Sequence, residues 1–258
     1  MSKPRILLLD IETSPIIAYA WGLFDINIGL NQIKEDWNIL SFSAKWLGEK
    51  KMHYYDLRNS KVTDDRKLLK PLLKLLNEAD IVVTQNGKRF DIRKINARLI
   101  INNMPCPSPF RQIDTLTLAK KHFGFTSNKL EYMTAKLCKK YRKSSHRKFP
   151  GMLLWTECLA GNVEAWKEME DYNNADVLSL QELYNRFAPW GTGITFSVYN
   201  DSTLEACNCG STAFTKRGYN YSNNGKYQRF QCNSCHAWTS SKENLLTKEK
   251  RKSLRKKL

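Results

Sequence analysis

The chain has 258 residues, of which 42 are Lys or Arg and 25 are Asp or Glu, so its formal net charge is +17. With 41% hydrophobic residues it can bury a core, and no apolar run reaches the roughly 18 residues of a membrane span. The N-terminus lacks a signal-peptide core, so we expect a cytoplasmic protein rather than a membrane or secreted one. The strongly basic balance favours nucleic acid as the partner.

Two segments carry most of this charge. Residues 136–148 hold seven Lys or Arg and no acid, and residues 248–258 hold seven Lys or Arg and one Glu. Such runs are either solvated, mobile segments or contacts to the phosphates of a nucleic acid, and two in one chain add weight to the second interpretation. The residues of the first run that we expect to contact nucleic acid are Lys139, Lys140, Arg142 and Lys143.

The first 190 residues alternate between strand and helix patterns, which is typical of an α/β domain. Strands are expected over residues 6–9, 38–47, 52–57, 80–85 and 111–115. Helices are expected from an N-cap within 63–65 to about 77, and over 90–103, 130–140 and 163–187, the last as one helix or two. We predict a domain over residues 1–190, a linker over 191–203, a small ribbon over 204–240 and a basic tail over 241–258.

Four of the seven cysteines form two close pairs, a C-x-C and a C-x-x-C with 22 residues between them. Two such pairs can converge on one tetrahedral Zn²⁺ with four thiolate ligands. The first pair is one residue shorter than usual, which leaves His236 open as a substitute ligand. The paired residues are Cys207, Cys209, Cys232 and Cys235, and the other three, expected to be inert thiols, are Cys106, Cys138 and Cys158.

Acidic residues mark three places at the ends of predicted elements. Asp10 and Glu12 end the first strand, and alternation puts both carboxylates on one face of it. Asp91 ends the motif N-G-K-R-F-D, where a strand passes into a helix. Tyr172 and Asp176 are four residues apart and share one face of a helix. Each motif alone fits a structural role better than a catalytic one, although paired carboxylates are tolerated when a cation lies between them.

Taken in order, the D-x-E, N-x-x-x-F-D and Y-x-x-x-D motifs resemble those of the DEDD family of 3′–5′ exonucleases, within the ribonuclease-H-like superfamily. The tyrosine four residues before the last aspartate resembles the DEDDy branch, which includes polymerase proofreading domains. The resemblance covers about residues 5–188. It implies an α/β fold with a ribonuclease-H-like mixed sheet flanked by helices, and a small zinc ribbon follows. Asp114-Thr115-Leu116 resembles a further D-T-L motif, in which we expect Asp114 to support the site.

The resemblance also implies roles for these residues. Oxygen ligands suit Mg²⁺ or Mn²⁺, and two such ions would activate a water and stabilise the leaving 3′-oxygen. Tyr172 would orient the attacking water, because a phenol is too weak a base to deprotonate water unaided. The four expected metal ligands are Asp10, Glu12, Asp91 and Asp176. The residues expected to hold the 3′-terminal nucleotide are Thr13, Asn86 and Phe90.

Residues 204–240 resemble small zinc ribbons of transposase-like and other DNA-associated proteins. Their aromatic residues are interleaved with basic ones, including Arg217 and Arg229. Such aromatic residues either stack on nucleobases or form the minimal core of the ribbon itself. Zinc ribbons also bind proteins, so a replication or recombination partner is a further interpretation.

The sequence therefore predicts a metal-dependent 3′–5′ exonuclease with two Mg²⁺ or Mn²⁺ and one structural Zn²⁺. DNA is favoured over RNA, single strands are favoured over duplexes, and no membrane partner is expected. One alternative is a structure-selective endonuclease, because this fold carries both chemistries. Another is a nucleic-acid-binding accessory protein with an idle site.

Overall fold

The computed structural model describes residues 4–141, 146, 148–199 and 203–254. The chain forms two compact units, and the boundary lies between Tyr184 and Asn185, near the end of a long helix. The first unit begins at Arg5 and carries all three acidic motifs, whereas the second carries the paired cysteines. The predicted nuclease site and the predicted zinc site therefore belong to separate units.

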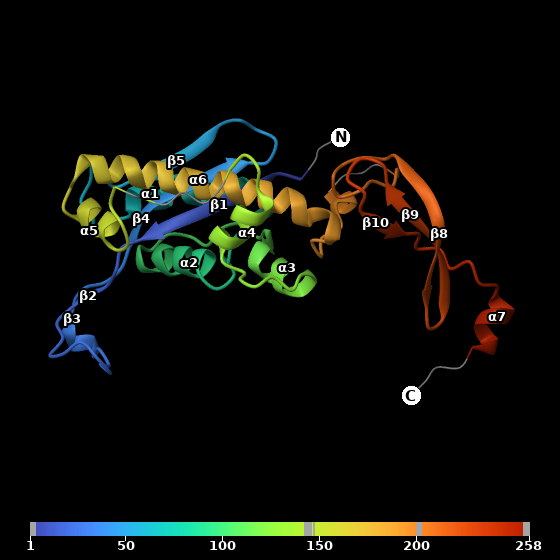
Figure 1. The fold of residues 1–258 in the computed structure, drawn as a ribbon, viewed down its shortest axis with the longest axis horizontal. Helices are drawn as coiled ribbons and strands as arrows, with labels where there is room; N and C mark the ends of the chain where they lie inside the picture. Colours follow the sequence, from blue (N-terminus) through green and yellow to red (C-terminus); the bar gives the residue numbers. More distant parts are fainter. Residues whose placement is uncertain (1–3, 142–145, 147, 200–202, 255–258) are drawn as a thin grey trace. The chain divides into compact units, whose positions relative to one another are not determined.

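A five-stranded mixed sheet forms the centre of the first unit (Figure 1). Its strands are β1 (Ile6–Thr13), β4 (Ile39–Trp46), β5 (Met52–Asp56), β6 (Ile81–Thr84) and β7 (Arg111–Asp114). The strand order is β5-β4-β1-β6-β7, with β1 antiparallel to β4 and parallel to β6. All five predicted strands are present, and the first strand of the chain lies in the middle of the sheet.

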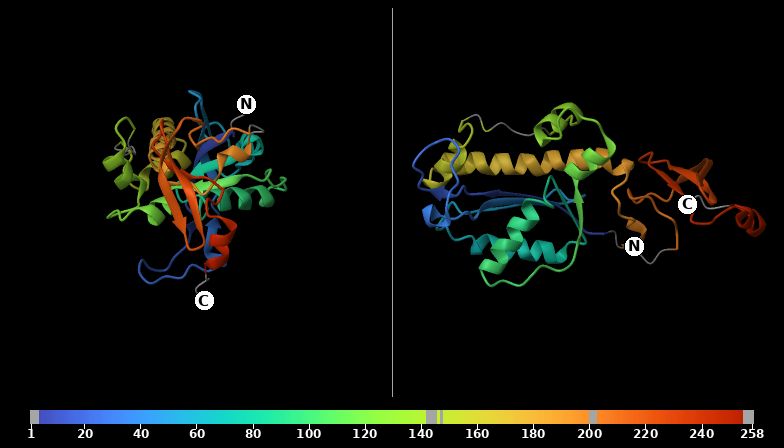
Figure 2. Two further views of the ribbon diagram at one scale, coloured as in Figure 1. Left: turned by 90° about the vertical axis from the view of Figure 1, so that its right-hand side faces the viewer. Right: turned by 90° about the horizontal axis from the view of Figure 1, so that it is seen from below.

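Helices cover both faces of this sheet. They are α1 (Arg66–Glu78), α2 (Asp91–Ile101), α3 (Thr115–His122), α4 (Leu130–Leu137), α5 (Leu153–Leu159) and α6 (Val163–Phe187). Figure 2 shows α6 running along one face, with α1 and α2 on the other. The predicted α/β fold, a mixed sheet flanked by helices, is confirmed. Within the described residues, no helix combines the length and the apolar character needed to cross a bilayer.

Alternation along β1 divides its side chains between the two faces. Leu7, Leu9 and Ile11 are buried in the main apolar cluster, which also contains the leucines of α1. Asp10 and Glu12 lie on the opposite face, where they accept hydrogen bonds from side chains of α6 and α5. The predicted placement of both carboxylates on one face is thus confirmed.

Several elements differ from the prediction. The first strand was expected to end at about residue 10, but β1 continues to Thr13 because its polar end still pairs with β4. The short helices α3 and α5 were not predicted. Residues 163–187, for which one helix or two were expected, form one helix.

Residues 15–37 leave the sheet between β1 and β4 as an arm (Figure 1). The arm contains two short antiparallel strands, β2 (Ile17–Ala18) and β3 (Ile33–Glu35). At its root, the backbone N–H of Ser14 donates to the carbonyl of Asn38 at 2.9 Å, and the N–H of Asn38 donates to Ser14 Oγ at 2.9 Å. The arm is therefore fixed at the end of β1, directly after the first acidic motif.

The second unit contains a three-stranded antiparallel sheet of order β10-β9-β8. The strands β8 and β9 are joined by a tight turn at Asn223-Asn224. After the sheet, Thr247 Oγ1 caps a short helix, α7 (Lys248–Ser253), by accepting from the N–H of Lys250 at 3.1 Å. The strand bounds are β8 (Phe214–Ser222), β9 (Gly225–Cys232) and β10 (Trp238–Ser240).

Candidate active site and metal centres

Three carboxylates meet between the end of β1 and the middle of α6. Asp10, Glu12 and Asp176 each offer an oxygen that lies within 4.8 Å of the other two. Asp176 is buried, and the other two are half-buried. Three like charges this close repel one another, and a divalent cation between them removes the repulsion. An all-oxygen donor set of this kind fits Mg²⁺ or Mn²⁺.

Asp91 lies next to this group and is not part of it. Since β1 and β6 are parallel neighbours, the residues that follow β6 return to the edge where the first acidic motif lies. There Asp91 Oδ1 accepts a hydrogen bond from the N–H of Ile11, the residue between Asp10 and Glu12, at 3.2 Å. Burial raises the pKa of Asp91 to about 7, because the charged form is desolvated, and the charge of Asp114 adds to the rise.

Asp114 holds the loop that leads from β6 to Asp91. Its carboxylate accepts from the N–H of Asn86 at 2.9 Å and from that of Lys88 at 3.3 Å. It also caps α3 by accepting from the N–H of Leu116 at 3.0 Å. These bonds give Asp114 the supporting position that the D-T-L motif implied.

A row of polar side chains joins α6 to β4 beside the carboxylates. Asn173 is fully buried, accepts from Ser41 Oγ at 3.2 Å and donates to Asp10 Oδ2 at 2.5 Å. About two turns further along α6, Lys45 Nζ donates to Gln181 Oε1 at 2.6 Å. These bonds set the position of α6 along β4, and with it the position of Asp176 relative to the carboxylates of β1. Sequence reasoning missed Asn173, because an amide inside the Y-N-N-A-D motif carries no signal of its own.

Three aromatic rings pack beside Glu12. Trp155 Nε1 on α5 donates to Glu12 Oε2 at 3.2 Å. The ring centroid of Tyr172 lies 6.0 Å from that of Trp155 and 5.2 Å from that of His146, both in edge contact. His146 and Trp155 complete the cluster with centroids 5.4 Å apart. The structure thus places Tyr172 at the site, among two residues that the sequence did not single out.

The basic run over 136–148 begins against α6. The carboxylate of Glu182 accepts from the N–H groups of Lys139, Lys140 and Tyr141 at 2.6, 3.1 and 3.0 Å. Further along the run, His146 contacts Tyr172 on the same helix. The described parts of the run therefore contact α6 on both sides of Asp176 in sequence. The predicted contact residues Arg142 and Lys143 lie outside the described residues.

The three residues expected to hold the terminal nucleotide lie at the same edge of the sheet. Thr13 is the last residue of β1. Asn86 follows β6 with a left-handed backbone, φ 67°. Phe90 precedes Asp91 and leaves 38% of its surface exposed. Each of the three thus lies in a segment that carries or adjoins an acidic motif, and their contact with a nucleotide stays a prediction.

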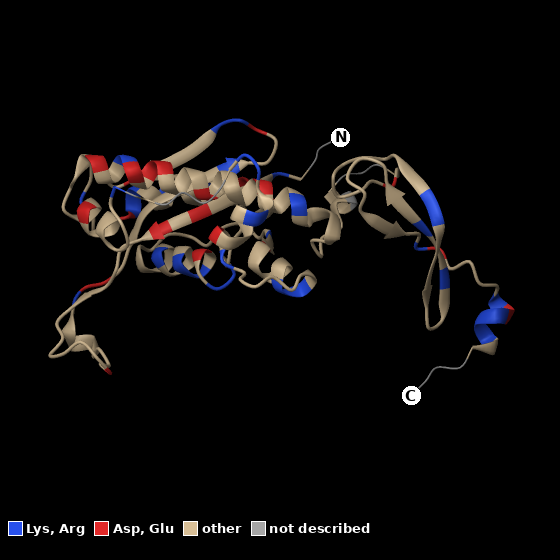
Figure 3. Ribbon diagram, in the orientation of Figure 1, with Lys and Arg blue, Asp and Glu red and all other residues tan. Residues whose placement is uncertain are grey.

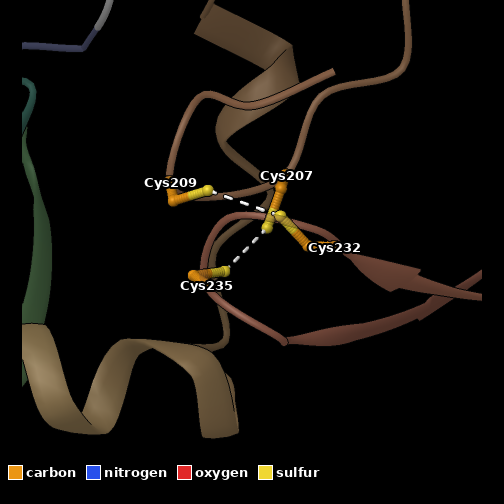
Figure 4. Close-up of side chains that lie close together, drawn as sticks. All are labelled: Cys207, Cys209, Cys232 and Cys235. Atoms are coloured by element: carbon orange, nitrogen blue, oxygen red, sulfur yellow. Dashed lines mark hydrogen bonds between the residues drawn. The ribbon is translucent and has the colours of Figure 1, made fainter. Parts of the chain in front are cut away.

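The four paired cysteines of the second unit meet in one cluster (Figure 4). Their sulfurs lie within 4.8 Å of one another, with separations of 3.4 Å for Cys207 to Cys235 and 3.6 Å for Cys209 to Cys232. Four Zn–S bonds of about 2.3 Å in a tetrahedron separate the sulfurs by about 3.8 Å, so the cluster fits zinc. The group contains no histidine among the described residues, which disfavours His236 as a substitute ligand.

Backbone hydrogen bonds favour the ionised form of one of these thiols, Cys232. Burial opposes ionisation of Cys232, but the N–H groups of Cys235 and Ser234 donate to its sulfur and lower its pKa to about 6. A thiolate at neutral pH is the form that binds a metal.

Exposed aromatic rings alternate with Lys and Arg side chains on the surface of the ribbon. Lys226 Nζ lies 3.9 Å from the ring centroid of Tyr219, and the guanidinium of Arg229 lies 4.9 Å from that of Trp238. Arg229 also donates to the carbonyl of Arg217 at 2.8 Å, which holds the two predicted basic residues side by side. Because Tyr219 and Trp238 are exposed, these rings are not the ribbon's own core.

Comparisons with known proteins agree with this architecture. A family model described as the RNase_H superfamily matches residues 7–188, the segment that contains all three acidic motifs. A solved structure of the family B DNA polymerase from the hyperthermophilic archaeon Pyrobaculum calidifontis is similar, with a TM-score of 0.52 and 13% sequence identity. The match covers 88% of this chain and 32% of the polymerase chain, and at this identity it concerns the fold alone. No curated protein matches the chain. Since the family model covers more than half of the chain, the chain belongs to the RNase_H superfamily.

Proposed function

We propose that this chain is a 3′–5′ exonuclease that hydrolyses phosphodiester bonds from the 3′ end of a nucleic acid, with single-stranded DNA as the favoured substrate. The observation that carries the proposal is the meeting of Asp10, Glu12 and Asp176, with Tyr172 one helical turn before Asp176. Membership of the RNase_H superfamily supports a nuclease.

Four carboxylates would hold the two Mg²⁺ or Mn²⁺ ions of this enzyme: Asp10, Glu12, Asp91 and Asp176. When bound, the ions make the attacking water more acidic and neutralise charge on the leaving 3′-oxygen. The chain keeps its own acids in place for this task, since Asn173 donates to Asp10 and Trp155 donates to Glu12.

Tyr172 would orient the attacking water. The phenol is held by edge contacts with Trp155 and His146. A phenol is too weak a base to deprotonate water unaided at neutral pH, so the hydroxyl would contribute a hydrogen bond. Thr13, Asn86 and Phe90 would hold the terminal nucleotide at the same edge.

The basic segments would hold the rest of the polyanion. Contacts of Lys and Arg with phosphates are independent of sequence and weaken with salt. A zinc ribbon with exposed rings would add stacking contacts or hold a replication or recombination protein. The proposed phosphate contacts are Lys139, Lys140, Arg142 and Lys143 in the first unit, and Arg217 and Arg229 in the ribbon.

A time course on 5′-labelled single strands with Mg²⁺ or Mn²⁺ tests the proposal. We expect stepwise shortening from the 3′ end and no reaction on a strand whose 3′ end is blocked. Internal cuts on the blocked strand would instead identify an endonuclease of the same fold. Asp10→Ala and Asp176→Ala should be inactive, whereas Glu49→Ala, at an exposed acid between β4 and β5, should keep full activity. Equal activity of all three variants would remove the metal-site assignment.

A further inference from the structure

The arm over residues 15–37 exposes an unusual set of large apolar side chains. Trp21 is fully exposed, and four further apolar residues of the arm leave 68–90% of their surface uncovered: Tyr19, Leu23, Phe24 and Leu30. Grouped apolar exposure of this kind marks a binding surface on a soluble domain. Residues 15–33 contain a single charged residue, Asp25, so the arm itself suits uncharged groups and not phosphates.

The position of the arm restricts what reaches it. The arm starts at Pro15, three residues after Glu12, and hydrogen bonds between Ser14 and Asn38 close its root. Figure 1 shows the arm extending from the end of β1, the strand that carries Asp10 and Glu12. A nucleic acid bound with its 3′ end at the carboxylates therefore lies beside the root of the arm.

Lys94 links the root of the arm to Phe90, the residue before Asp91. Trp37 is at the root, and Lys94 Nζ lies 3.5 Å from the centroid of its ring. The same ammonium group lies 5.7 Å from the ring centroid of Phe90, which directly precedes Asp91. The surface thus runs from Phe90 over Lys94 to Trp37 and on to the arm.

Positive charge flanks this surface. Lys88, Arg89 and Arg93 are exposed around the start of α2, and Figure 3 shows basic residues along that helix. Aromatic rings beside a line of Lys and Arg side chains form the usual surface for single-stranded nucleic acid. Nucleobases stack on the rings, while the phosphates contact the cationic side chains. Paired bases inside a duplex do not present free faces to such rings.

We infer that the arm binds an unpaired segment of the substrate strand and that its bases stack on Tyr19, Trp21 and Phe24. The phosphates of this segment contact the basic start of α2. The inference rests on the proposed function, since its ligand is the polynucleotide of that same site. The arm therefore sets a preference for strands long enough to reach it and single-stranded near the 3′ end.

The test compares wild type with the variant Tyr19→Ala/Trp21→Ala/Phe24→Ala. The exposure of these side chains predicts an unchanged melting curve. Binding of labelled strands of about 12 nucleotides, measured by fluorescence anisotropy without divalent cations, should weaken about tenfold or more. The slope of log Kd against log salt should stay the same, because no phosphate contact is removed. Turnover of a dinucleotide, which is too short to reach the arm, should not change.

Two further variants separate the contributions. Ile100→Ala/Ile101→Ala removes exposed apolar surface at the far end of α2 and should leave affinity unchanged. Arg89→Ala/Arg93→Ala should lower the magnitude of the salt slope by about 1.4, since each phosphate contact on a single strand contributes about 0.7.

Each outcome decides between the inference and its rivals. A triple variant that binds and degrades long strands like wild type overturns the inference and leaves the proposed function intact. A wild type that binds strands through the arm but hydrolyses none overturns the function and leaves the inference. A dimer in sedimentation that the triple variant abolishes, with unchanged affinity for strands, assigns the arm to a second copy of the chain instead. A wild type that neither binds nor hydrolyses strands overturns both.

Discussion

At the scale of single residues, uncharged groups hold three acids of the candidate site in place. Asn173 donates to Asp10, Trp155 donates to Glu12, and a backbone N–H donates to Asp91. Hydrogen bonds of this kind set the direction of a carboxylate before a metal arrives, and their loss weakens metal binding. The site is therefore built by neighbours as much as by the acids themselves.

Trp155→Phe tests one of these neighbours. The variant keeps a ring against Tyr172 and His146 and removes the N–H that donates to Glu12. A hydrogen bond to a charged group contributes about 1.5–3 kcal/mol, so we expect kcat to fall about tenfold and KM for the strand to change little. The Mg²⁺ concentration at half-maximal rate should rise. Steady-state kinetics at several Mg²⁺ concentrations measures both quantities. The control variant Trp46→Phe, at the end of β4 away from Ser41, should show neither effect.

Asp91 predicts how the stability of the metal-free protein depends on pH. Burial raises its pKa to about 7 in the fold, against about 3.9 in an unfolded chain. The folded state thus binds the proton more strongly, and the free energy of unfolding falls as pH rises from about 4 to about 7. Asp91→Asn removes this ionisation and should be more stable than wild type at pH 8, with little difference at pH 4.

Urea unfolding in EDTA at the two pH values measures this difference. Added Mg²⁺ should narrow it for wild type, because a bound cation favours the charged carboxylate. A variant that is less stable than wild type at pH 8 would show that the carboxylate is already stabilised as an anion.

At the scale of elements, one buried carboxylate links α1 and α2, the two helices on the face of the sheet opposite α6. Asp65, just before α1, is fully buried and accepts from the N–H of Ile39 on β4 at 3.0 Å. It also accepts from Arg98 on α2, at 2.6 Å from Nε and 3.0 Å from Nη2. The start of α2 carries Asp91, so this ion pair helps to set the position of the site.

Arg98→Ala is expected to lower the free energy of unfolding by about 3–5 kcal/mol, because it leaves the carboxylate of Asp65 buried without its cation. Replacing both partners, in Asp65→Asn/Arg98→Met, should recover much of that loss. Urea unfolding of the three proteins measures it. Arg66→Ala breaks an exposed pair with Asp64 and should change stability little. Equal effects of Arg98→Ala and Arg66→Ala would contradict the assigned role.

The elements that the sequence predicted are those with a strong apolar pattern. The buried runs of β4 and β6 and the leucines of α1 are visible in the sequence because their periodicity is close to ideal. The polar end of β1 was missed because its pairing with β4, and not its hydropathy, makes it a strand. The arm was missed because exposed apolar residues give no periodicity at all.

The candidate site divides in the same way. The acids and Tyr172 were found because their order and spacing along the chain resemble a family pattern. His146 and Trp155 come from a loop and a short helix that reach Tyr172 only in the folded chain. No spacing rule connects a residue of such a loop with the end of β1, so only packing places them there.

At the scale of the whole molecule, charge and function are distributed over two units. The chain carries a net charge of +17, whereas the three carboxylates that meet at the candidate site of the first unit are of the opposite sign. The zinc cluster belongs to the second unit, which has its own sheet. Catalysis and the holding of a long strand are therefore expected to be separable by mutation.

Cys232→Ser tests this separation. The second unit buries few apolar side chains, so its sheet should depend on one bound zinc, as in other small metal-stabilised domains. We expect elemental analysis to find one zinc in wild type and none in the variant. The first unit has its own core, so turnover of a dinucleotide should persist, whereas affinity for long strands should fall. Cys106→Ser, at an exposed cysteine of the first unit, should change none of these quantities.

The outcomes of this substitution distinguish the roles of the ribbon. Loss of zinc with unchanged affinity for long strands would favour a protein partner for the ribbon over nucleic acid. Loss of dinucleotide turnover would contradict the independence of the two units. If the wild-type protein contained no zinc, the metal assignment would be wrong. The four sulfurs within 4.8 Å of one another would then need another explanation. Because each unit has its own sheet, we expect dinucleotide turnover to be retained and binding of long nucleic-acid strands to weaken, which would identify the ribbon as a tether for the nucleic acid.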